Sequence, residues 1–227
     1  MQVFPSRLRH RLFALLAALL LGAALVPATA SAGSPDPRDA EALVKETTEQ
    51  LLEALREQAS DGEIDVDVLR AKVDELVKPH LDFVTMTRLA VGRHWRDASD
   101  DQKRALVEEF RQLLVRTYQS ALEQVEEYDG QRIEFLPMRE SNHADRAEVR
   151  SRVIQPDGPE IPVNYGLRYT GGEWKLYDII VDGISLVTTY RSGFSTVVSR
   201  DGIDGLIEDL RRKNERGETD VPDLDAG

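Results

Sequence analysis

The feature that most restricts the fold is a strict alternation along residues 161–169. Apolar or aromatic side chains occupy every second position of this stretch, at Ile161, Val163, Tyr165, Leu167 and Tyr169. A period of two is typical of a β-strand with one buried face, because successive side chains point to opposite faces of a sheet. The chain therefore contains a sheet with a long, apolar and partly aromatic face.

Three more stretches of the same region have strand-like patterns. Apolar residues alternate with polar ones around residues 133–135 and 147–153, and residues 174–182 form the last predicted strand. Turn-forming sequences at residues 156–159 and 170–172 separate the last three strands. Short turns of this kind join antiparallel neighbours. We expect a twisted, mainly antiparallel, four-stranded sheet.

Helical patterns lie on both sides of this region. Apolar residues recur every three or four positions, which predicts helices over residues 39–60, 65–78, 81–91, 100–127, 186–199 and 204–213. Ser99 and Gln102 form a capping box at the start of the longest helix. The predicted fold class is α+β, with the helices packed on the apolar face of the sheet.

The N-terminus has the three parts of a secretory signal. Arg7, Arg9 and Arg11 precede an apolar run over residues 12–26, and Ala30 ends a small-x-small cleavage pattern. The run is shorter than the roughly 20 residues that a membrane span needs. We expect export, with cleavage after Ala30 or after Ala32.

The remaining organisation follows from composition. Residues 31–38 are predicted to be a flexible leader and residues 39–213 a single domain. Residues 214–227 are acidic, with little to bury, and are predicted to be a disordered tail. The chain has a formal net charge of −12 and no cysteine. Such a charge opposes nucleic-acid binding, and the composition excludes disulfides and thiolate sites.

The sequence holds few signs of catalysis. The histidines, His10, His80, His94 and His143, have no metal-ligand spacing. Ser185 follows a strand and precedes a helix, but the second glycine of a nucleophile elbow is missing. A capping role is the better interpretation of this serine. We expect no metal and no cofactor.

Two side chains keep an enzymatic alternative open. Asp178 or Tyr165 could act as an acid or base in an apolar, cone-shaped active site on the sheet. A third reading is a non-lipid adaptor with a filled core. The periodicity alone does not separate a filled core from a hollow one.

Several motifs in order resemble the MlaC family of periplasmic phospholipid-binding proteins. They occupy residues 89–96, 161–165 and 174–187, followed by Tyr190, Arg191 and Phe194. The resemblance covers about residues 40–213. Departures from the family pattern include Asp182, where glutamate is usual, and Gly193, where a longer polar residue is usual.

This resemblance implies a monomeric lipid carrier in the periplasm, with helices and sheet enclosing an apolar cavity, and no catalysis. The implied partners are phospholipid, an inner-membrane MCE-domain protein of an ABC lipid transporter, and an outer-membrane lipoprotein complex. The implied role is maintenance of outer-membrane lipid asymmetry. Arg191 is the candidate headgroup contact. Candidate cavity residues are Phe83, Met86, Leu113, Tyr118, Val149, Val153, Val163, Tyr165, Leu167, Trp174, Leu176, Tyr190 and Phe194.

Overall fold

The computed structural model describes residues 35–60, 64–76, 78–122, 130–139, 143–156 and 158–219. The predicted signal peptide and most of the predicted acidic tail lie outside these residues. No helix within the described ranges has the length and apolar character to cross a membrane.

The chain order is helices, sheet, helix, so the α+β class is confirmed. The helical elements before the sheet are α2 (Pro37–Ser60), α3 (Val66–Leu76), η1 (Lys78–His80), α4 (Phe83–Val91), η2 (Gly92–Arg96) and α5 (Asp100–Leu122). The strands are β1 (Arg132–Leu136), β2 (Arg146–Ile154), β3 (Ile161–Thr170), β4 (Glu173–Val181) and β5 (Ile184–Ser185). The last helix is α6 (Tyr190–Glu215).

The sheet is an antiparallel meander in the order β1-β2-β3-β4-β5. It has five strands, so the expected number of four is wrong. The extra strand, β5, returns from β4 through a two-residue turn in which Asp182 and Gly183 have φ of 50° and 84°. Positive φ at both positions is what a type I′ hairpin turn requires. Two residues are too few to show a period, so the sequence did not reveal this strand.

A β-bulge at Tyr177 divides β4 into two halves. Leu176 pairs with Leu167 and Asp178 pairs with Gly166, which leaves Tyr177 as an extra residue. Its ring covers Gly166, where an added Cβ would lie 3.1 Å from Tyr177 Cζ. A bulge shifts the alternation by one position. Ile179 therefore joins the buried face, and Asp178 points to the other face.

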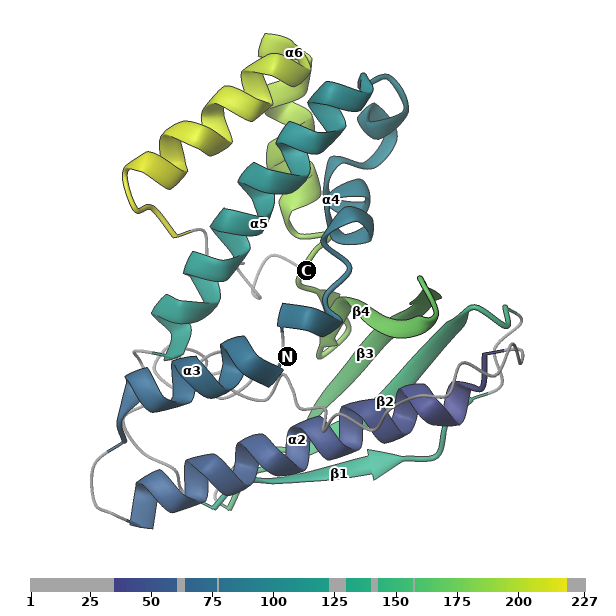
Figure 1. Cartoon of the computed structure of the whole chain (residues 1–227), viewed down its shortest axis with the longest axis vertical. Coiled ribbons are helices and arrows are strands. Elements are labelled where there is room, and N and C mark those ends of the chain that lie inside the picture. Colours follow the sequence, from purple (N-terminus) through teal and green to yellow (C-terminus); the bar gives the residue numbers. More distant parts are fainter. Residues whose placement is uncertain are drawn as a thin grey trace.

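One helix covers the apolar face of the sheet. Figure 1 shows α2 lying lengthwise across this face. Ala40 and Val44 of α2 belong to the same buried cluster as the inward side chains of the strands. The indole Nε1 of Trp174 donates a hydrogen bond to the carbonyl oxygen of Asp36 (3.1 Å), which fixes the start of the helix to β4.

The segment before α4 runs along part of β4. The Asp82 N–H donates to the Leu176 carbonyl oxygen (2.8 Å), and Lys175 Nζ donates to the Pro79 carbonyl oxygen (3.0 Å). Leu81 forms an isolated parallel bridge with Leu176. This contact connects the sheet to the helices that follow.

The helices α4, α5 and α6 gather on the other side of this connection (Figure 1). The capping box of α5 is confirmed, because Gln102 Oε1 accepts from the Ser99 N–H (2.9 Å) and Ser99 Oγ accepts from the Gln102 N–H (3.2 Å). The two helices predicted over 186–199 and 204–213 are the two parts of α6, which are separated at Gly202, where the backbone is not helical (φ 76°, ψ −176°). It begins at Tyr190, later than predicted, because residues 186–189 form a turn in which the Leu186 N–H donates to the Ile179 carbonyl oxygen (2.8 Å) and the Val187 N–H donates to Asp178 Oδ1 (3.3 Å).

Candidate functional site

The candidate residues on the sheet come together as predicted. Seven side chains share one buried cluster between the sheet and α2, and each is at most 6 % exposed. They are Val149, Val153, Val163, Tyr165, Leu167, Trp174 and Leu176. Alternation along three neighbouring strands explains their shared face.

The helical candidates lie elsewhere. Met86, Leu113, Tyr190 and Phe194 are buried in a second cluster formed by α4, α5 and α6, and Phe83 packs against it. The ring of Phe110 stands edge-on to Tyr190 and Phe194, with centroids 5.0 and 5.2 Å away. These aromatic side chains therefore fill a separate helical core.

Tyr118 lies in neither group. It packs against a third cluster, and its hydroxyl donates to Asp74 of α3. The helical and sheet candidates thus belong to separate buried clusters, and α5 and α6 pack mainly on each other. Leu81, which the sequence did not single out, contacts all three clusters.

Two hydroxyls interrupt the apolar surface between the sheet and α2. Tyr165 Oη and Thr48 Oγ1 are buried, and within the described part of the chain neither has a hydrogen-bond partner. Burial raises the pKa of Tyr165 to about 12, although the nearby hydroxyls of Ser151 and Thr48 act against this rise. Tyr165 is therefore a neutral donor at ordinary pH, and a poor candidate for a general base.

Asp178 is held in a structural role. Its carboxylate accepts from Ser185 Oγ (2.6 Å) and from the N–H groups of Ile179 (2.9 Å) and Val187 (3.3 Å). Burial raises the pKa of Asp178, while these hydrogen bonds and the charge of Arg191 act in the opposite direction. Both oxygens are engaged, and the bulge places this group on the opposite face from Tyr165.

The capping interpretation of Ser185 is confirmed in a modified form. Its Oγ accepts from the Thr188 N–H (3.0 Å) while donating to Asp178. It therefore caps the turn between β5 and α6, not the first turn of α6. In the described ranges, no group of three or more side chains is arranged to ligate a metal.

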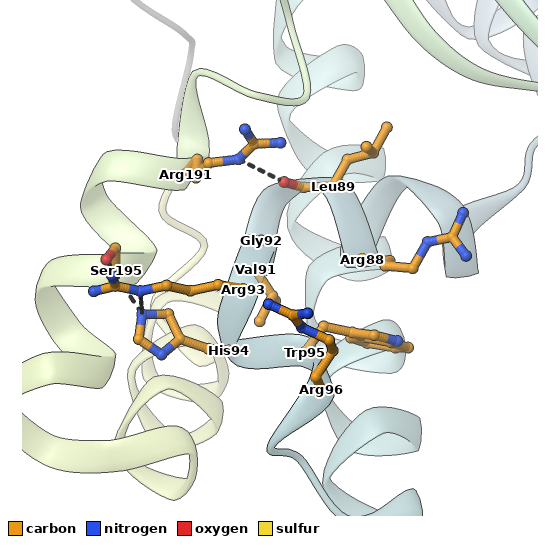
Figure 2. A pocket seen from close by; sticks show the side chains of 10 residues that line it. All are labelled: Arg88, Leu89, Val91, Gly92, Arg93, His94, Trp95, Arg96, Arg191 and Ser195. Atoms are coloured by element: carbon orange, nitrogen blue, oxygen red, sulfur yellow. Dashed lines mark hydrogen bonds between the residues drawn. The ribbon is translucent and has the colours of Figure 1, made fainter.

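Arg191 lies in a pocket of about 590 Å³ on the helical part (Figure 2). Its Nε donates to the Leu89 carbonyl oxygen (3.0 Å), and its stem passes over Gly92, the residue with positive φ that ends α4. Across the pocket, His94 Nε2 and Ser195 Oγ are 3.3 Å apart. The sequence placed Arg191 among aromatic residues, but only the fold brings it beside residues 88–96.

Comparisons with known proteins agree with this architecture. A family model described as MlaC protein matches residues 45–212. The chain is 28% identical over 200 residues to the toluene tolerance protein Ttg2D of Pseudomonas putida, covering 88% of this chain and 86% of that protein. It is 23% identical over 173 residues to the intermembrane phospholipid transport system binding protein MlaC of Haemophilus influenzae, covering 75% and 79% of the two chains.

A solved structure is also similar. It is the phospholipid-binding protein from Ralstonia solanacearum in complex with a phospholipid. The TM-score is 0.56 and the sequence identity is 30%, with 67% of this chain and 84% of that chain covered.

Proposed function

The chain belongs to the MlaC family, and from this premise we propose that it is a periplasmic carrier of phospholipid. It takes lipid between an inner-membrane ABC transporter with an MCE-domain protein and an outer-membrane lipoprotein complex, and so maintains the lipid asymmetry of the outer membrane. The observation that carries the proposal is the similar protein from Ralstonia solanacearum, which holds a phospholipid.

The physical need for a carrier follows from the lipid itself. Two acyl chains contain roughly 30 methylene groups, and each favours burial by about 0.8 kcal/mol. Exposing both chains to water therefore costs on the order of 20 kcal/mol. A protein that encloses the chains removes this barrier, and it needs an apolar surface more than it needs reactive groups.

We assign the acyl chains to the surface between α2 and the sheet. The seven buried sheet residues there form the largest continuous set among the candidates. The helical core is filled by aromatic rings in edge-to-face contact, which is an ordinary way to fill a core. The buried hydroxyls of Tyr165 and Thr48 make no hydrogen bond of ordinary geometry among the described residues, so they offer donors to polar atoms of a lipid within that surface.

The enzymatic alternative has less support. Both oxygens of Asp178 accept hydrogen bonds that hold the chain between β4 and α6. Tyr165 is neutral and points to the other face of the sheet. The two groups therefore do not form an acid–base pair, and the relatives found are lipid-binding transport proteins.

The test is the lipid content of the purified protein. Organic extraction and native mass spectrometry should find phospholipid bound to the unchanged chain. In Val163→Glu and Leu167→Glu, a charge enters the proposed surface. Burying an unpaired charge costs more than the roughly 1.4 kcal/mol that a tenfold change represents. We expect the lipid bound per folded protein to fall at least about tenfold.

Asn164→Glu is the matched control. Asn164 lies between Val163 and Tyr165 on the same strand but faces the other side, opposite Arg150. This variant should keep its lipid, with circular dichroism as the folding check. Lipid-free unchanged protein would contradict the carrier function. Equal loss in all three variants would contradict the assigned surface, and unfolding of the two inward variants would indicate a filled core.

A further inference from the structure

The pocket that contains Arg191 has an unusual charge for this chain. It is lined by Arg88, Arg93, Arg96 and Arg191, with Trp95 among them, and no acidic residue is part of its lining. The chain as a whole carries a net charge of −12. We propose that this arginine pocket is a docking site for an acidic segment of a partner protein.

Within the described residues, none of the four arginines forms a close ion pair, although the charge of Arg191 acts at longer range on Asp178. Among the described residues, no carboxylate oxygen lies within 4.0 Å of any of their guanidinium groups. Elsewhere such contacts are common: Arg152 pairs with Glu134 (2.9 Å) and Glu160 (2.7 Å), and Arg211 pairs with Glu109 (3.2 Å). Gathering unpaired like charges is unfavourable for the free protein. A bound anionic partner would offset this cost.

The arrangement of the side chains indicates what kind of anion fits. Figure 2 shows Arg93 extending toward Ser195 on α6, while Arg88 points away on the opposite side of the pocket. Arg191 Nε donates to the Leu89 carbonyl oxygen, and among the described residues its two terminal nitrogens have no acceptor of their own. Guanidinium groups that point apart do not converge on one phosphate. They match carboxylates spread along a polypeptide, and the indole of Trp95 adds an apolar surface between them.

The charge of the whole chain argues against a lipid surface as the partner. A net charge of −12 repels an anionic bilayer, and this repulsion acts over the entire molecule. An acidic protein segment can enter the pocket alone, so it does not bring an extended anionic surface close to the rest of the molecule. The biological purpose of this docking rests on the proposed carrier function, because a carrier must recognise the proteins that load and unload it. The binding itself can be measured on protein stripped of lipid.

The test uses a fluorescent synthetic peptide of repeating Asp-Glu-Leu units, measured by fluorescence anisotropy with the full mature chain. The pocket variant is Arg93→Glu with Arg96→Glu. Its matched control is Arg132→Glu with Arg146→Glu, two exposed arginines of the sheet, which changes the net charge equally. We expect the Kd for the peptide to rise about tenfold or more in the pocket variant and less than about twofold in the control.

Equal weakening in both variants would overturn the proposal, because the binding would then follow net charge alone. So would displacement of the peptide by inorganic phosphate at equal concentration, or stronger binding to phosphatidylglycerol vesicles than to the peptide. Lipid content is measured on the same variants. Loss of lipid in the pocket variant would assign these arginines to the carried lipid and overturn docking, while the carrier function would stand. If the unchanged protein binds the peptide but never holds lipid, docking would stand and the carrier function would be contradicted.

Discussion

At the scale of single residues, the carboxyl group of Asp178 holds the junction between the sheet and α6. It lies directly after the bulge, and its hydrogen bonds from Ser185 and Val187 hold the turn that leads from the sheet to α6. Burial raises its pKa, so the folded protein holds the proton more tightly than the unfolded chain does. The contribution of this group to stability is then complete at low pH, and it is lost as the pH rises through the pKa in the folded protein.

Asparagine at this position cannot ionise, so the Asp178→Asn variant should not lose this contribution to stability as the pH rises. We expect the stability of the variant relative to the unchanged protein to increase from about pH 3 to about pH 7. Urea unfolding at several pH values measures this difference. A relative stability that decreases with pH would mean that folding lowers the pKa. Lipid content should not change, since Asp178 faces away from the surface between α2 and the sheet.

At the scale of elements, the start of α5 makes hydrogen bonds within its own helix and also to α6. The capping box satisfies N–H groups that the helix leaves unpaired. Gln102 Nε2 also donates to Asp204 Oδ1 (2.7 Å), just beyond the bend of α6 at Gly202. The cap therefore connects the first turn of α5 to the second part of α6.

Ser99→Ala should lower the free energy of unfolding by about 1 kcal/mol, the usual effect of losing a helix cap. For a chain of this size, the melting temperature should fall by roughly 2–4 °C. Ser192→Ala is the control, because Ser192 is an exposed serine of α6 with no side-chain hydrogen bond among the described residues. Differential scanning calorimetry compares the two. Equal shifts would show that the cap contributes nothing beyond an ordinary surface change.

At the scale of the molecule, the two proposed sites bind their ligands through different interactions. Acyl chains are held by burial, which salt screens little, whereas the arginine pocket acts through exposed charges. Raising salt from about 0.1 M to about 1 M shortens the Debye length from about 10 Å to about 3 Å. We expect peptide affinity to fall about tenfold or more over this range, while the amount of bound phospholipid stays nearly constant. A parallel decrease of both would mean that the lipid is held chiefly by its headgroup.

The sequence by itself determined the local features. The period of two gave the strands and their buried face, and the period of three to four gave the helices. The capping box at Ser99 was also correct, because it depends only on residues that are neighbours in the chain.

Only the tertiary structure decided how these pieces meet. The bulge at Tyr177, the short pairing of β5 and the separation of Leu113 and Tyr190 from the sheet depend on which surfaces pack together. The arginine pocket joins residues 88–96 to residues 191–195, which are about a hundred positions apart. Periodicity reports the face on which a side chain lies, whereas its neighbours across the core are set by long-range packing.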